Sequence, residues 1–273
     1  MDRRLTPANG RAALETLRGL VDAPLYTKGE PARVALPVAD LLKAPDGARD
    51  RQLLWGEAVT VIDRHAGWAF LQAAKDGYCG YLPEAALAAP QESSHWVATP
   101  GTHLYDGPKV QHRERAALSL GARVQVIGQT GTWAETPDGF VPAQHLRALG
   151  DWLADPATVA QSLLHTPYLW GGNSRAGIDC SGLAQLAFQA CGLALPGDSD
   201  LQAACGTAIP AGAPLQRNDL IFWKGHVALA LSPDRMIHAT AAVMAVTEED
   251  IPAAIARIRA AGEGEPTHFR RIL

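Results

Sequence analysis

The sequence predicts an α+β protein in which small β units precede a unit built from both helices and strands. Two segments, 54–83 and 120–142, repeat one order of short strands and turns. Further along, a helical apolar pattern is followed by short strand-like runs close enough to pair antiparallel. We therefore expect four parts: an N-terminal segment at 1–29, β units at 30–90 and 91–149, and an α+β unit at 150–273.

The N-terminal segment contains a stretch rich in Ala and Leu at residues 8–21. Its apolar residues recur at helical spacing, which predicts a short helix before the first β unit.

Each β unit contains an alternating strand, a loop, a strand that opens with tryptophan, an Asp-Gly turn and a short closing strand. The tryptophans are Trp68 and Trp133, and the turns follow them by a few residues. Repeats of this kind predict two small barrels. Their aromatic residues are expected either to fill the barrel cores or to line a ligand groove.

The last unit begins with Asp155 and Pro156, a combination typical of a helix N-cap followed by the first helical position. That helix is expected to end near His165. A second helix should follow Asp179 and stop at Gly192. Three strands are then expected to pair antiparallel, at 220–223, 227–231 and 235–239.

Composition excludes several classes of partner. The chain has 273 residues, 47% of them hydrophobic, and a formal net charge of −4. With a pI near 6.1, a nucleic-acid or anionic-membrane partner is not expected. No run reaches the ~18 apolar residues of a membrane span, and the charged start is not followed by an apolar segment, so we expect a cytoplasmic protein.

Cys180 is the candidate nucleophile. A free thiol with a pKa of about 8.5 is mostly protonated at neutral pH, and a helix N-terminus or a nearby imidazole lowers that value. Asp179 is expected to cap the helix and leave Cys180 in its first turn, where free N–H groups would stabilise a thiolate and later an oxyanion.

His226 is the candidate base, because it opens an apolar strand directly after a Lys-Gly turn. A third polar group usually orients such a base, and His238 on the next expected strand could accept its hydrogen bond. The other cysteines, Cys79, Cys191 and Cys205, are expected to be small buried hydrophobes. No C-x-x-C or H-x-x-x-H pair indicates a metal site, and no cofactor is expected.

These residues resemble the NlpC/P60 family of cysteine peptidases, papain-like enzymes that cut peptides of bacterial cell-wall origin. The matching motifs are at 166–172, 179–183, 217–223, 225–228 and 237–239. The resemblance implies a papain-like core with Cys180 as nucleophile, His226 as general base and acid, and His238 as the orienting residue. Tyr168 matches a tyrosine that lies beside the nucleophile.

The order of two bacterial SH3-like barrels and this domain resembles the γ-D-glutamyl-L-diamino acid endopeptidases. These cleave murein peptides of the form L-Ala-γ-D-Glu-diamino acid that have a free N-terminal L-Ala. The resemblance implies that Asp179, Ser181, Glu57 and a tyrosine of the first barrel hold the free ammonium. That tyrosine is either Tyr81 or Tyr78.

The sequence departs from this subgroup in one place. An arginine often precedes the Asp-Ser-Asp segment there, whereas this chain has Pro196-Gly197 before Asp198. Ser199 or a backbone amide would then have to recognise the D-Glu carboxylate.

Murein peptide recycling is therefore the expected function. Two alternatives remain open at this point: a cysteine amidase or acyltransferase of the same fold, and a binding module whose last domain has lost its activity.

Overall fold

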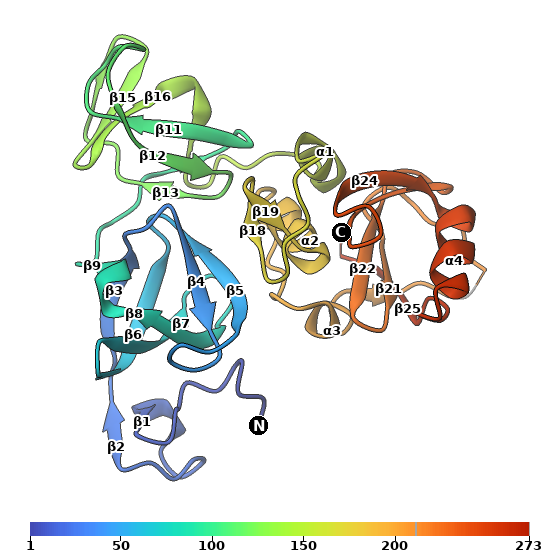
Figure 1. Ribbon diagram of the computed structural model, residues 1–273, viewed down its shortest axis with the longest axis horizontal. Helices are drawn as coiled ribbons and strands as arrows, with labels where there is room; N and C mark the ends of the chain where they lie inside the picture. The colour runs from blue at the N-terminus through green and yellow to red at the C-terminus, as the bar shows by residue number, and fades with distance from the viewer. Residues whose placement is uncertain (211, 273) are drawn as a thin grey trace. The chain divides into compact units, whose positions relative to one another are not determined.

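The computed structural model describes residues 1–210 and 212–272. It divides into two compact units, Met1–Asp151 and Trp152–Leu273, and most of their helices and strands are labelled in Figure 1. No helix in these described ranges is long and apolar enough to cross a membrane.

The N-terminal segment does not form the expected helix. Its residues instead form strand β1 (Ala12–Leu14), which pairs in parallel with β2 (Leu25–Thr27), and a single 3-10 turn, η1 (Glu15–Leu17). The side-chain oxygen of Asn9 accepts hydrogen bonds from the N–H groups of Arg11 and Ala12, which fixes a turn where the helix would start. Ala12 is fully buried against Ile62, Phe70 and Cys79, so tertiary packing overrides helix propensity here.

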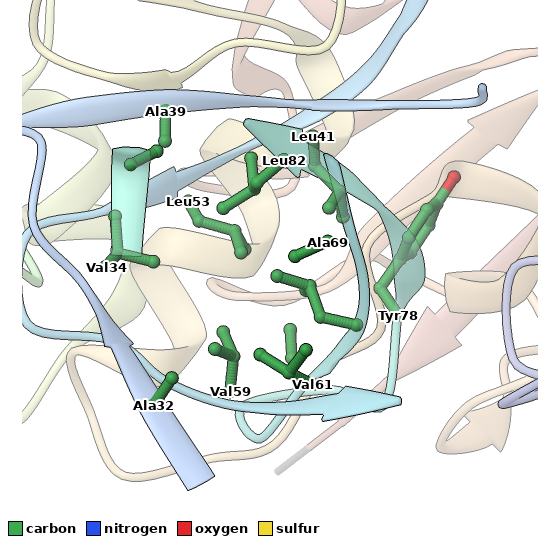
Figure 2. Close-up of a cluster of buried hydrophobic side chains, with 13 residues drawn as sticks. Ala32, Val34, Ala39, Leu41, Leu53, Val59, Val61, Ala69, Tyr78 and Leu82 are labelled. Carbon is green, nitrogen blue, oxygen red and sulfur yellow. The ribbon is translucent and has the colours of Figure 1, made fainter. Parts of the chain in front are cut away.

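The first β module, residues 30–88, is one antiparallel sheet with strand order β5-β4-β8-β7-β6-β3-β9. Its core is aliphatic, as Figure 2 shows, and Tyr78 stands at the edge of that cluster. Trp68 is only half-buried, so it does not fill the core. The strands are β3 (Glu30–Val34), β4 (Val38–Leu42), β5 (Arg49–Leu54), β6 (Ala58–His65), β7 (Trp68–Ala73), β8 (Cys79–Pro83) and β9 (Leu87–Ala88), with η2 (Glu84–Ala86) before the last.

The second β module, residues 95–148, has a five-stranded sheet of order β12-β11-β16-β15-β14 and a three-stranded sheet of order β13-β10-β17. Its core also includes Leu54 and Trp55 of the first module, so the two modules share buried surface. The elements are β10 (His95–Val97), β11 (Gly101–Tyr105), β12 (Glu114–Ser119), β13 (Arg123–Val124), β14 (Gly128–Thr130), β15 (Trp133–Thr136), β16 (Gly139–Pro142), η3 (Ala143–His145) and β17 (Leu146–Ala148).

Both copies of the sequence repeat form the same order of elements, but the first alternating strand is irregular in a different way in each copy. The first alternating strand forms continuous β6, whose register shifts between Val61 and Asp63. In the second copy the same strand is split into β13 and β14, which belong to different sheets. A bulge or a break at this position lets the chain turn a barrel corner. Both copies then close with a strand, a 3-10 turn and a two- or three-residue strand.

The second unit is a six-stranded sheet of order β20-β25-β21-β22-β23-β24 with helices against it. Helix α2 contacts β22 and β23, while α4 packs its apolar side chains on the sheet; Figure 1 shows the two helices on different sides. The expected antiparallel pairing of the three central strands is confirmed. The elements are α1 (Pro156–Ser162), β18 (Asn173–Ser174), β19 (Gly177–Ile178), α2 (Cys180–Gln189), α3 (Ser199–Gln202), β20 (Thr207–Ala208), β21 (Leu220–Trp223), β22 (His226–Ala230), β23 (Arg235–Thr240), β24 (Ala245–Asp250), α4 (Ile251–Ala260) and β25 (His268–Arg271).

The start of α1 confirms the expected cap. The Asp155 carboxylate accepts from the Thr158 N–H at 3.1 Å, and Pro156 takes the first helical position. The same carboxylate accepts from Arg217 Nη2 at 2.6 Å and Asn218 Nδ2 at 2.9 Å. Arg217 and Asn218 lie just before β21. The partly buried Asp155 carboxylate therefore connects the first helix of the unit to its central sheet.

Candidate active site

Cys180 is the first residue of α2, and Asp179 is its N-cap. The Asp179 Oδ1 atom accepts from the Gly182 N–H at 2.6 Å, which satisfies one of the unpaired donors at the helix start. Gly192 has φ +76°, and the N–H of Leu193 returns to the Phe188 carbonyl at 3.0 Å, so the helix ends as expected in a left-handed cap.

The Asp179 carboxylate has further partners. Oδ1 also accepts from the Ser181 hydroxyl at 3.0 Å, and Oδ2 accepts from the Gly171 N–H at 2.8 Å. A carboxylate offers about four lone-pair sites, two on each oxygen. Oδ1 therefore has both of its sites in use, while Oδ2 retains one for a further donor.

The pair Gly171-Gly172, in the motif at 166–172, is in contact with the start of α2. A Cβ atom built on Gly182 would lie 2.3 Å from the carbonyl oxygen of Gly172. Only glycine allows the two backbones to come this close. The Gly171 N–H bond to Asp179 and this backbone contact together fix the loop 169–172 against the nucleophile.

His226 and His238 lie together on the sheet. Leu229 pairs with Ile237, which makes the two histidines diagonal neighbours on one face of β22 and β23. His226 Nε2 is 2.8 Å from His238 Nδ1. Since Nε2 of His226 is engaged in this contact, Nδ1 is the ring nitrogen that remains to exchange a proton with a thiol.

The Cys180 thiol is next to the start of β22, where the backbone N–H of Val227 stabilises its anionic form. Burial nevertheless raises the pKa of Cys180, Asp179 raises it further, and the N–H groups of Val227 and Ser181 only partly oppose them. The expectation that the helix terminus and imidazole would leave the thiol with a lowered pKa is therefore wrong for the free protein, because desolvation outweighs them.

Burial also lowers the pKa of His226, and the neighbouring His238 and Arg257 lower it further. Both shifts favour the neutral thiol and the neutral imidazole over a thiolate and an imidazolium in the free protein.

Tyr168 lies near the nucleophile, and Ser199 belongs to a short helix that is bonded to the first turn of α2. Tyr168 is half-buried, and burial, Cys180 and Asp179, in that order, raise the pKa of its hydroxyl to about 12. It is therefore a neutral hydrogen-bond donor near Cys180. Ser199 opens α3, whose Gln202 side chain donates to the Ser181 carbonyl at 2.9 Å and so ties α3 to the first turn of α2.

A residue that the motifs did not indicate lies behind the histidines. Glu249 Oε2 is 3.0 Å from His238 Nε2, and the same carboxylate is held by Arg257 of α4. The only sequence signal was an acidic run at 248–250, which is most simply a solvated strand edge. Its meaning depends on the pairing of β23 with β24, which the sequence does not specify.

The remaining candidates, Glu57, Tyr78 and Tyr81, are in the unit of residues 1–151. Glu57 is 8% exposed; its Oε1 accepts from Lys75 Nζ at 2.8 Å, and Oε2 has no hydrogen-bond partner among the described residues. It is thus a buried carboxylate rather than a solvent-facing one.

The two tyrosines of that unit occupy different places. Tyr81 packs on Phe70, with ring centroids 5.0 Å apart, in the cluster under the N-terminal segment. The Tyr78 carbonyl accepts from Ala73, and Ala74 donates to the Ala58 carbonyl. These bonds put Tyr78 at the same end of β6 and β7 as Glu57.

Of the three other cysteines, which were all expected to be buried, only one is. Cys79 is buried, but Cys191 and Cys205 are only partly buried, because they lie at the end of α2 and after α3 rather than inside the core. Within residues 1–210 and 212–272, no group of three or more His, Cys, Asp or Glu side chains is arranged to hold a metal ion.

Comparisons with known proteins found matches to both units of the chain. The model described as the NlpC/P60 family matches residues 165–258, and the one described as the bacterial dipeptidyl-peptidase SH3 domain matches residues 41–87. A relative from Bacillus cereus named gamma-D-glutamyl-L-lysine dipeptidyl-peptidase is 29% identical over 237 residues, which cover 72% of this chain and 69% of that protein. Dipeptidyl-peptidase 6 from Lysinibacillus sphaericus is 26% identical over 237 residues, covering 77% and 87%.

A solved structure shares the fold. The crystal structure of an NlpC/P60 family protein from Bacillus cereus superimposes with a TM-score of 0.76 at 24% sequence identity, and the match covers 89% of this chain and 100% of that one. The mixed α and β architecture with an SH3-like domain before the last unit is thereby confirmed.

Proposed function

Because this chain belongs to the NlpC/P60 family and is a cysteine peptidase, we propose that it cleaves the γ-D-glutamyl–diamino acid bond of cell-wall-derived peptides with a free N-terminal L-Ala. The arrangement of Cys180 at the start of α2 with the His226–His238 pair carries the hydrolytic part of this proposal. The names of the relatives, two of which are gamma-D-glutamyl-L-lysine dipeptidyl-peptidases, support the bond that is cut.

The reaction would begin when the thiol of Cys180 attacks the γ-glutamyl carbonyl carbon and its proton passes to Nδ1 of His226. The N–H groups at the start of α2 and the neutral hydroxyl of Tyr168 are the donors available for the oxyanion. His226 would then protonate the departing amine of the diamino acid, which leaves a thioester on Cys180. Water, deprotonated by the same imidazole, would release L-Ala-D-Glu and restore the thiol.

The requirement for a free N-terminal amine on the peptide would arise because carboxylates with unused hydrogen-bond acceptor sites would bind its ammonium group. Asp179 retains one lone-pair site on Oδ2, and Glu57 has a buried Oε2 with no partner among the described residues. A buried unsatisfied carboxylate oxygen costs free energy that an ammonium donor would remove. Ser181, as a partner of Asp179, would set the orientation of that carboxylate.

One tyrosine of the first β module would also contact the ammonium. We favour Tyr78 over Tyr81, because Tyr78 lies at the Glu57 end of β6 and β7. Ser199 is the proposed contact for the D-Glu carboxylate, since α3 is tied to the first turn of α2.

The second β module would be a second SH3-like domain, since it repeats the closing strand, 3-10 turn and short strand of the first. The substrate class would place the enzyme in recycling of murein peptides. No cofactor enters the proposed reaction.

Mass spectrometry of peptide products tests this function. We expect L-Ala-D-Glu from L-Ala-γ-D-Glu-meso-diaminopimelate, from its L-Lys analogue, or from both, and no product from the N-acetylated peptides. Cys180→Ala should release nothing. Cleavage of the acetylated peptides would overturn the amine requirement, and no cleavage of any peptide would redirect the search to other amides or acyl groups.

Glu57→Gln separates the amine proposal from the catalytic one. If Glu57 binds the ammonium equally in the ground and transition states, this variant should raise KM with little change in kcat. A loss confined to kcat would contradict its proposed role. Glu84→Gln, a change at a surface ion pair of the same module, is the matched control.

A further inference from the structure

The carboxylate of Glu249 continues the chain of polar groups behind the nucleophile. Met236 pairs with Glu249 and His238 with Thr247, so Glu249 is the diagonal neighbour of His238 on the same face of β23 and β24. His238 is fully buried, and its Nε2 lies 3.0 Å from Glu249 Oε2. His238 Nε2 makes no hydrogen bond to any other group among the described residues, so the Glu249 carboxylate is its polar contact.

Helix α4 fixes this carboxylate in place. Arg257 Nε donates to Glu249 Oε1 at 3.1 Å, and Arg257 Nη2 donates to Oε2 at 2.6 Å. This two-point pairing gives the carboxylate one orientation. The contact with His238, followed by the bonds from Arg257, lowers the pKa of Glu249, so it is an anion at neutral pH.

An anion beside Nε2 selects the tautomer of His238. With the proton on Nε2, the N–H faces the carboxylate; with the proton on Nδ1, a lone pair faces it and is repelled. His238 then presents the Nδ1 lone pair to His226 and can accept only from an Nε2–H there, at the observed 2.8 Å. His226 in that form has its Nδ1 lone pair free to take the thiol proton.

We propose that Glu249, held by Arg257, is a positioning residue that keeps His238 and His226 in the tautomers required for proton transfer from Cys180. It also stabilises the imidazolium that forms when His226 takes that proton. This inference rests on the roles proposed above for Cys180 and His226 but is independent of the identity of the peptide substrate.

The charged and titratable neighbours of the two histidines come from several elements. Strand β24 supplies Glu249, α4 supplies Arg257, and α2 supplies Cys180 with its cap Asp179. Tyr168 faces the same thiol from the loop before β18. Helix α1, which contacts β23, has no titratable side chain. Glu249 is the only anion of this set in contact with the histidine pair.

Glu249→Gln tests the inference, because it keeps the shape and removes the charge. The matched control is Glu248→Gln on the same strand: Glu248 points to the other face and pairs with Gln161 and Arg235. Both changes are made in a background with Cys191→Ser and Cys205→Ser, so that iodoacetamide reports on Cys180. Alkylation rates are measured from pH 5 to pH 10, alongside kcat and KM on a cleaved peptide.

We expect Glu249→Gln to slow alkylation at pH 7 and to lower kcat about tenfold, a part of the ~10²–10⁴-fold that a general base contributes, with KM nearly unchanged. The acid limb of both pH profiles should move to lower pH by up to about one unit, because the loss of the Glu249 anion destabilises the imidazolium and lowers the pKa of His226. Glu248→Gln should match the parent. Unchanged profiles in a folded Glu249→Gln protein would overturn the inference.

The tautomers can be read without any substitution. Nitrogen-15 chemical shifts of the unmodified protein should show neutral His226 and His238 both protonated on Nε2 at pH 7. A proton on Nδ1 of His238 would overturn the inference even if Glu249→Gln fails to fold. The assignment of the nucleophile is tested separately in the Cys191→Ser, Cys205→Ser protein without a change at Glu249. If iodoacetamide alkylates Cys180 there no faster than Cys79, the role proposed for Cys180 is wrong, whatever the effect of Glu249→Gln.

Discussion

Gly182→Ala is the substitution for which helix propensity and packing predict opposite results. In an ordinary helix interior, replacing glycine by alanine stabilises by about 1 kcal/mol. Here the new Cβ would lie 2.3 Å from the Gly172 carbonyl oxygen, and the neighbours at 3.1 and 3.3 Å are Asp179 Oδ1 and Asn173 Nδ2. The obstacle is backbone, so loop 169–172 must move by about 1 Å, an overpacking that costs about 1–3 kcal/mol. The packing cost is therefore expected to exceed the gain in helix propensity, and the free energy of unfolding should fall by up to about 2 kcal/mol.

The same displacement should reach the reaction. The loop donates the Gly171 N–H to Asp179, and a misplacement of about 1 Å can cost about 10²-fold in rate. Urea unfolding and kcat/KM on the cleaved peptide measure the two effects. Gly128→Ala is the control, because its new Cβ would first meet Glu135 Oε2, the flexible end of a side chain, at 3.2 Å. A Gly182→Ala protein that is more stable and fully active would show that loop 169–172 accommodates the new Cβ without cost.

Two further predictions concern stability. Burial alone would raise the pKa of Asp155, but bonds from Arg217, Thr158 and Asn218 lower it overall. Asp155→Asn should therefore cost about 1 kcal/mol at pH 7, since Asn still caps a helix and the ion pair is partly exposed. Because the folded pKa lies below the unfolded value of about 3.9, this difference should disappear between about pH 5 and pH 2 in urea unfolding, and a constant difference would contradict the assignment. Leu54→Ala should cost about 2–5 kcal/mol, since Leu54 is 2% exposed in the core of the second module, whereas exposed Leu36→Ala should change stability by less than about 0.5 kcal/mol. A loss below 1 kcal/mol for Leu54→Ala would show that the modules are not packed together.

The features that the sequence predicted correctly are those decided by neighbouring residues. Asp155 with Pro156 and Asp179 with Gly182 cap their helices through bonds that span three residues, so their spacing is visible in the sequence. The antiparallel strands β21, β22 and β23 follow from short connections.

The features that the sequence did not predict depend on distant parts of the chain. The apolar residues at 8–21 have helical spacing, but Ala12 is buried on Ile62 and Phe70 as part of a strand. A local pattern does not include that competing surface. The pKa of Cys180 differs from the expectation for a related reason: the helix N-terminus is visible in the sequence, but the burial of the thiol in the folded unit is not.

The neutral thiol and the position of Asp179 have a joint consequence for specificity. Asp179 raises the pKa of Cys180, and its Oδ2 atom has one unused acceptor site. A substrate ammonium bound there would offset the negative charge that opposes the thiolate. Binding the correct amine would then favour the attacking form of Cys180, whereas an acetylated peptide would leave that charge unbalanced. The amine requirement would thus be expressed in kcat as well as in KM, and this separates Asp179 from Glu57, for which only KM is expected to change.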